Sequence, residues 1–150
     1  MNLKEKINND LKESMKSGDK LRLETVRSIR ALILEHEKSG KDKDLTPEEE
    51  IGMLTSAAKK RKDSIEQFKA GNRLELAEKE EKELAIIQSY LPKQLDEDDI
   101  LSEVKKIAEE IGAKTKQDFP KLMPATMKIL KGKADGAVIR KVIENFLESN

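Results

Sequence analysis

The side chains that could perform nucleophilic or metal chemistry are scarce in this sequence. His36 is the only histidine, and the chain contains no cysteine. A Ser–His nucleophile pair would have to use His36, but Glu35 and Glu37 beside it lie on other faces of a helix, and no G-x-S-x-G elbow is present. Without cysteine, disulfides and cysteine-based zinc sites are excluded. We interpret His36 as a solvated residue near a helix end, and we predict no catalytic residue, no metal site and no cofactor.

Two groups of carboxylates offer another route to chemistry, as a magnesium site or as an acid–base pair. Residues 96–99 are all acidic and stand where a helix is predicted to begin. The helix dipole stabilises negative charge in a first turn, so we interpret this cluster as a cap led by Asp96. The second group consists of Glu78, Glu80, Glu81 and Glu83. A helix this charged is predicted to expose them to water, with Glu78 and Lys82 as an i,i+4 pair.

A first basic cluster, residues 59–62, lies in the middle of a predicted helix. Arg61 comes seven residues after Leu54 and four before Ile65, which places it beside the apolar stripe of that helix. Two interpretations remain open. Either Arg61 extends along the stripe or pairs with a carboxylate of a neighbouring helix, or the cluster contacts phosphates.

A second basic cluster surrounds a turn near the C-terminus. Lys128, Lys131 and Lys133 flank Gly132, and a helix follows. Glycine lets a backbone approach a partner closely, and a helix N-terminus attracts anions. Asp135 opposes this attraction if its own carboxylate caps the helix. The pattern predicts a contact with phosphates.

The distribution of charge agrees with this prediction. The chain has no formal net charge, yet residues 113–150 carry 8 basic and 4 acidic side chains, whereas residues 93–112 carry 3 and 7. The further candidates for phosphate contact in the basic segment are Lys116, Lys121, Arg140 and Lys141. Binding of a polyanion is therefore predicted as a local property of the C-terminal third.

Helices must position these residues, because strand-type runs of β-branched and aromatic residues are missing. Apolar spacing predicts an all-α protein with four longer helices at about 3–17, 20–38, 46–71 and 72–91, followed by three shorter ones at about 96–112, 116–130 and 136–147. The change in helix length near residues 92–95 predicts two domains, 1–92 and 93–150.

Local sequence predicts how several of these helices begin and continue. Thr46 with Glu49 and Asn72 with Glu75 are predicted to cap the third and fourth helices. Pro124 cannot donate to a carbonyl, so we expect a kink or a restart in the sixth segment.

Composition restricts the class of protein further. Apolar residues make up 36% and charged residues 40%, which is typical of slim helical bundles. Aromatic residues make up only 3%, so a stacking platform for single-stranded nucleic acid is disfavoured. No apolar run approaches the ~20 residues of a membrane span, and residues 1–10 lack the apolar core of a signal peptide. We expect a cytoplasmic protein without a membrane partner.

Four segments resemble a known family. They are LRLETVRSIRALI at 21–33, KRKDSIEQF at 60–68, YLPKQL at 90–95, and KGKADG at 131–136 followed by Val138 and Val142. In this order and spacing they resemble the GatB/YqeY family of small stand-alone proteins. The C-terminal part of that family is similar to the tail domain of GatB, the large RNA-binding component of the aspartyl/glutamyl-tRNA amidotransferase.

The resemblance implies a tRNA-handling module without the chemistry of that enzyme. The glutaminase centre of the amidotransferase lies in another component, and its kinase and transamidation centre lies in the large catalytic domain of GatB. Proteins of this family also inherit the label of carbon–nitrogen ligases with glutamine as amide donor, which no residue of this chain directly supports.

Three hypotheses of function result. The first is a non-catalytic module that binds the body of tRNA, and not DNA, by shape and charge. Its predicted contacts are Lys131 and Lys133, supported by Gly132, Lys116, Lys121, Lys128, Arg140 and Lys141. The second is an adaptor for an amidotransferase or aminoacyl-tRNA synthetase, docked through the stripe Leu3, Ile7, Leu11 and Met15. Packing of that stripe inside a bundle is the favoured interpretation. The third, an enzyme, rests on the family label alone.

Overall fold

The computed structural model describes residues 1–39 and 44–149. Within these residues every regular element is a helix, which confirms the predicted all-helical class. The chain divides into two compact units, Met1–Leu91 and Pro92–Asn150, and each is described by itself. Their correspondence to the independent domains 1–92 and 93–150 stays a prediction.

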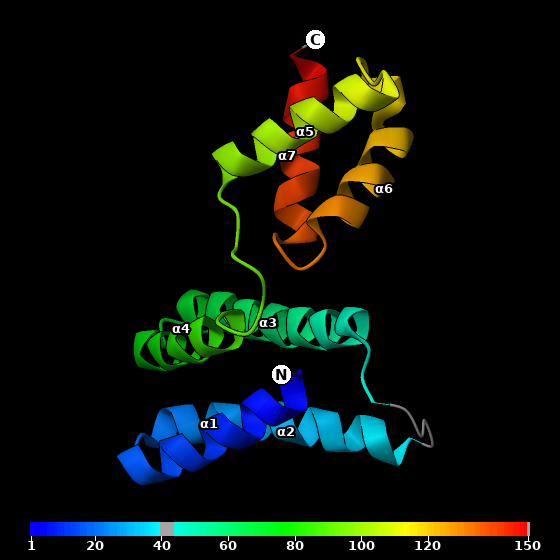
Figure 1. Cartoon of the computed structure of the whole chain (residues 1–150). Coiled ribbons are helices and arrows are strands. Elements are labelled where there is room, and N and C mark those ends of the chain that lie inside the picture. Colours follow the sequence, from blue (N-terminus) through cyan, green and yellow to red (C-terminus); the bar gives the residue numbers. More distant parts are fainter. Residues whose placement is uncertain (40–43, 150) are drawn as a thin grey trace. The chain divides into compact units, whose positions relative to one another are not determined.

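The N-terminal unit consists of two helical hairpins. α1 (Leu3–Ser17) packs on α2 (Lys20–Lys38), and α3 (Pro47–Ala70) packs on α4 (Leu74–Gln88), as Figure 1 shows. Contacts between α2 and α4 join the two hairpins.

The core of this unit takes residues from all four helices. Its buried members are Leu3, Ile7, Val26, Ile29, Ile33, Leu54, Ala58 and Ile87. Leu3 and Ile7 come from the stripe of the first helix, so that stripe packs inside the bundle, as the sequence favoured. Met15 at its far end is 53% exposed.

Helix starts follow local sequence at two predicted places. Thr46 forms a capping box with Glu49 at the start of α3, and Asp96 forms one with Asp99 at the start of α5. The Asp96 side chain accepts from the Asp99 N–H at 2.8 Å. The acidic cluster at 96–99 is therefore the predicted cap.

The turn between α3 and α4 differs from the prediction that Asn72 caps the fourth helix. Asn72 has a φ of 57°, and Arg73 occupies the N-cap without a side-chain hydrogen bond. The Arg73 N–H donates to the Phe68 carbonyl at 2.8 Å, and the Asn72 N–H donates to the Lys69 carbonyl at 3.1 Å. These two bonds form a Schellman motif, in which asparagine takes the left-handed position usually held by glycine. Asn72 therefore ends α3 instead of starting α4.

The C-terminal unit is a small bundle of three α-helices with one 3₁₀ turn. The elements are α5 (Glu97–Ile111), η1 (Lys116–Asp118), α6 (Phe119–Leu130) and α7 (Gly136–Glu148). Each α-helix packs on the other two, and η1 packs on α6 and α7. The buried core consists of Ile100, Val104, Ile107, Ala108, Ala113, Leu122, Leu130, Ile139, Val142, Ile143 and Leu147.

Pro124 lies inside α6 without ending it. One helix runs from Phe119 to Leu130, so the restart that the sequence predicted does not occur. The Pro120 carbonyl four residues earlier receives no N–H from Pro124. α6 persists because Leu122 and Leu130 are fully buried in the core of the unit, and this burial outweighs one missing hydrogen bond.

Candidate functional site

A tight turn between α6 and α7 carries two of the predicted phosphate-binding lysines. The Lys133 N–H donates to the Leu130 carbonyl at 2.9 Å, which closes a four-residue β-turn. Lys131 has φ −54° and ψ 124°, and Gly132 has φ 78°. These angles define a type II turn, whose third position requires positive φ and thus favours glycine. Lys131 and Lys133 are the second and fourth residues of the turn, and both are exposed.

Residues 92–95 hold this turn through hydrogen bonds within the C-terminal unit. Gln94 Nε2 donates to the Gly132 carbonyl at 2.7 Å and to the Pro92 carbonyl at 2.8 Å. The Leu95 N–H donates to the Lys133 carbonyl at 2.8 Å. Gln94 was not among the predicted site residues, because a carboxamide beside a proline gives no local sign of a partner 38 residues away.

Gly132 has a different place from the one expected for it. It was predicted to be among the residues that approach a partner, but Gly132 is buried and its carbonyl is engaged by Gln94. The glycine supplies the positive φ of the turn. Any ligand at this turn therefore meets lysine side chains.

The N-terminus of α7 is already occupied by a carboxylate. Asp135 is the N-cap, and its side chain accepts from the Ala137 N–H at 3.1 Å. A capping carboxylate satisfies an amide that an anion would otherwise use and adds a negative charge. Attraction of phosphate at this turn therefore depends on the lysines.

The structure separates the predicted basic residues into two groups. Lys128, Lys131 and Lys133 lie at the C-terminal end of α6 and in the turn that follows. Lys116 and Lys121 lie in η1 and in the first turn of α6, the opposite end of a 12-residue helix that is ~18 Å long. The eight residues do not form one compact patch.

Charge pairing distinguishes these groups as well. Lys116 lies 3.9 Å from Glu148, and Arg140 donates to Glu144 at 3.0 Å and lies 5.9 Å from the centre of the Phe119 ring. Among residues 1–39 and 44–149, no carboxylate lies within ion-pair distance of Lys128, Lys131, Lys133 or Lys141. The turn thus carries the lysines available to an external anion.

Both charges flank the clamp segment, residues 92–95. Lys93 is exposed and directly precedes Gln94, so it adds a lysine that was not predicted from the sequence. The acidic residues 96–99 directly follow Leu95. Because these carboxylates repel phosphate, they limit the basic surface on the side of α5.

The N-terminal unit contains a buried ion cluster that contradicts one prediction. Glu83 is only 8% exposed, and its carboxylate lies 3.2 Å from Arg61 Nε. Glu80 lies 3.5 Å from the same nitrogen. Burial raises the pKa of Glu83, Arg61 opposes the rise, and Glu80 adds to it. The prediction that these glutamates face water is wrong for Glu83, whereas the pairing of Arg61 with a neighbouring helix is confirmed.

Tyr90 anchors α1 to the end of α4. Its hydroxyl donates to the carboxylate of Asp10, which also lies 3.7 Å from Arg22. Burial and the Asp10 charge raise the pKa of Tyr90. The YLPKQL segment therefore has two polar side chains with separate partners: Tyr90 in the N-terminal unit and Gln94 in the C-terminal unit.

His36 lies closer to an ion pair than to open solvent. Its side chain is 15% exposed, and Nε2 lies 3.4 Å from a carboxylate oxygen of Glu49 on α3. This corrects the prediction of a solvated histidine.

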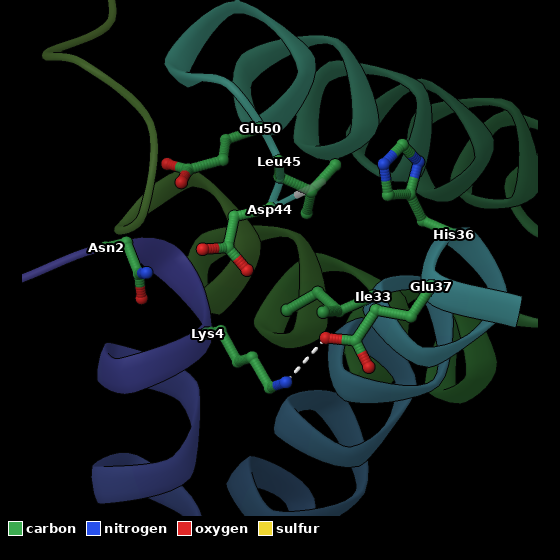
Figure 2. A pocket seen from close by; sticks show the side chains of 8 residues that line it. All are labelled: Asn2, Lys4, Ile33, His36, Glu37, Asp44, Leu45 and Glu50. Atoms are coloured by element: carbon green, nitrogen blue, oxygen red, sulfur yellow. Dashed lines mark hydrogen bonds and ion pairs between the residues drawn. The ribbon is translucent and has the colours of Figure 1, made fainter. Parts of the chain in front are cut away.

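Beside His36, the ends of α1 and α2 and the start of α3 surround a small cavity. Figure 2 shows its lining, with the Lys4–Glu37 ion pair of 2.5 Å at one side. The cavity measures about 10 Å³, which is roughly the volume for one water molecule. Its size suits a structural water between helix ends and not an organic substrate.

The described part of the chain lacks two other features. Residues 1–39 and 44–149 contain no group of three or more Asp, Glu or His side chains arranged to hold a metal ion. No helix in the same ranges is long and apolar enough to cross a membrane.

Helical hairpins, a small three-helix unit and a clamped basic turn define a class of all-helical proteins in which the polar clusters described here serve mainly to join helices. The chain belongs to the YqeY-like family, whose model matches residues 4–147.

Three curated relatives are fungal. Proteins of Candida glabrata and Lachancea thermotolerans, each named "Altered inheritance of mitochondria protein 41, mitochondrial", are 37% and 38% identical over 57% of this chain. These matches cover 47% and 46% of the relatives, so the chain spans about half of their length. A protein of the same name from Pyrenophora tritici-repentis is 30% identical over 92% of this chain and 77% of its own length.

These names overturn one expectation. A cytoplasmic protein was expected from the sequence, and that expectation is wrong on this comparison, because the relatives are named as mitochondrial proteins. The physical reason is that polar helical composition is common to proteins of several compartments, so composition does not identify one.

Proposed function

We propose that this chain binds structured RNA, with tRNA as the first candidate, as an auxiliary module to which no catalytic step is assigned. The observation that carries the proposal is the type II turn, held on a clamped backbone, with Lys131 and Lys133 exposed and without a carboxylate partner among the described residues. The resemblance of the C-terminal part to the amidotransferase tail supports tRNA as the RNA.

Recognition in this proposal uses shape and charge. Lysines bind phosphates as point charges, and A-form RNA is recognised mainly through its backbone. Lys128 extends the contact along α6, and Lys141 extends it along α7. The acidic start of α5 limits the contact on one side, because phosphates avoid carboxylates. Lys116 and Arg140, which have carboxylate partners, contribute less than was expected from the sequence.

A tRNA titration at several salt concentrations tests this function. Neutralisation of about three phosphates gives a slope of about −2 to −3 in a plot of log K against log salt. The double variant Lys131→Glu with Lys133→Glu should abolish most of the binding at low salt and flatten the slope.

The matched control is Lys105→Glu with Lys106→Glu, which makes the same change of charge on exposed residues of α5. It should reduce affinity far less, because these lysines lie on the acidic helix. Absence of tRNA binding by the unmodified chain at low salt, or equal losses in both double variants, would contradict the proposal.

A second candidate, a protein-interaction adaptor, is favoured by two exposed leucines. Leu74 and Leu76 at the start of α4 are 60% and 40% exposed, and exposed apolar side chains close together are typical of docking surfaces. The partner would be an amidotransferase or aminoacyl-tRNA synthetase component. Binding to such a purified component in the presence of nuclease, lost in Leu74→Ser with Leu76→Ser, is the expected result. Binding that both substitutions leave unchanged would remove this candidate.

A further inference from the structure

We infer that Gln94 is a positioning residue for the proposed RNA contact: its carboxamide holds the Leu130–Lys133 turn so that Lys131 and Lys133 meet phosphates in one backbone conformation. The inference rests on the proposed function for its RNA readout. It adds a residue that touches no RNA and acts through the turn.

The geometry gives Gln94 a fixed direction. A carboxamide nitrogen has two N–H donors, and here its two partners are the carbonyls of Pro92 and Gly132. Proline restricts the backbone just before the clamp, so the Pro92 carbonyl is a well-ordered acceptor. Gln94 therefore carries the order of its own segment across to the turn.

The turn needs an external support of this kind. Gly132 has the widest conformational freedom of any residue type, and it sits at the centre of the turn. Its carbonyl is part-buried, so removal of the Gln94 donor leaves an unsatisfied acceptor in the native turn. A turn that is ordered before binding loses less conformational entropy when its lysines contact RNA.

The second bond of the clamp does not replace the first. The Leu95 N–H donates to the Lys133 carbonyl, which lies one residue beyond Gly132. This main-chain bond remains in any Gln94 variant, so the effect of the side chain can be measured alone. Glutamate is not a suitable substitute, because its carboxylate would face two carbonyl oxygens.

The variant Gln94→Met keeps the length of the side chain and removes both donors. It should weaken tRNA binding about fivefold, the factor that one hydrogen bond of ordinary net strength supplies. The control Gln117→Met makes the same change on an exposed residue of η1 in the same unit and should leave affinity unchanged. Equal weakening by both variants would overturn the inference.

A double-mutant cycle separates positioning from general support of the fold. In the background Lys131→Ala with Lys133→Ala, Gln94→Met should cause no further loss of affinity, because the side chains that it positions are gone. An additional fivefold loss in that background would show that Gln94 acts elsewhere, and would overturn the inference.

A measurement without RNA distinguishes failure of this inference from failure of the proposed function. Backbone NMR order parameters of Gly132 and Lys133 should fall from about 0.85 towards 0.6 in Gln94→Met, while those of α7 stay high. If the unmodified chain binds no tRNA, the proposed function fails, and this drop still supports the clamp. Unchanged order parameters would overturn the inference whatever the RNA result.

Discussion

Glu83 lies on the buried side of α4, where its carboxylate is 3.2 Å from Arg61 and close to that of Glu80. Burial makes a charged carboxylate costly, and a neighbouring carboxylate increases that cost. Arg61 offsets part of the cost through its charge. The net result is a pKa above the ordinary value, so this residue couples the stability of the N-terminal unit to pH.

Replacement of Glu83 by glutamine should alter that coupling. The native state holds the Glu83 proton to a higher pH than the unfolded chain does, so this stabilising contribution is present below the ordinary pKa and is lost as pH rises through the raised pKa. Glu83→Gln has no such proton to lose. Its free energy of unfolding should therefore rise relative to that of the unmodified chain between about pH 4 and pH 7, as measured by urea denaturation at each pH.

Glu81→Gln is the control for this experiment. Glu81 lies on the same helix with its side chain 47% exposed, so its stability profile should run parallel to that of the unmodified chain. A Glu83→Gln profile that also runs parallel would contradict the raised pKa.

At the scale of elements, α6 shows packing prevailing over propensity. Its sequence has prolines at positions 120 and 124, yet the helix continues to Leu130. Pro120 lies in the first turn, where a missing N–H is tolerated, while Pro124 lies in the interior. The buried face that holds α6 also places the C-terminal end of the helix, and with it Lys128 and the basic turn.

Replacement of Pro124 by alanine should stabilise the C-terminal unit. Pro124 is exposed, and alanine would restore a donor for the Pro120 carbonyl and remove the contact of the ring with that carbonyl. This gain exceeds the lower entropy that proline gives the unfolded chain, so the free energy of unfolding should rise by about 1–2 kcal/mol. Urea denaturation followed by circular dichroism measures the change.

Pro120→Ala serves as the comparison within the same helix. It should change stability by less than Pro124→Ala, because the first turn needs no donor at that position. A loss of stability in Pro124→Ala would contradict this prediction and would mean that the proline ring itself packs in α6.

On the scale of the whole molecule, the C-terminal unit has no excess of positive charge. Residues 92–150 carry 11 basic and 11 acidic side chains. Binding of a polyanion therefore requires separation of charge within the unit, with acidic side chains on α5 and exposed lysines at the α6–α7 turn. For this reason the salt slope and the position-specific charge reversals are more informative tests than total charge.

Much of the helical fold was predictable because it depends on neighbours in sequence. Apolar spacing identified the helices, and the caps at Thr46 and Asp96 form between residues three positions apart. Gly112 ends α5 in a left-handed conformation, as its place after the apolar stripe indicated. Asn72 was misassigned because two helix ends compete for the same short turn, and the sequence pattern fitted both.

The candidate site was predictable only in part. The lysines and the glycine of the turn were visible as residue types, but their surroundings depend on contacts between distant segments. Glu83 became a buried residue through Arg61 on another helix, and Gly132 became part of a clamp through Gln94. Such partners leave no periodic signal, because each contact joins single residues across the fold.

The sequence by itself therefore determined the helices, most of their ends and the scarcity of catalytic residue types, since these depend on composition and on interactions within one helical turn. Only the tertiary structure decided which charges are paired or buried, which lysines remain available and what holds the basic turn. The physical reason is that pairing and burial are set when helices pack, and packing brings together residues that are far apart along the chain.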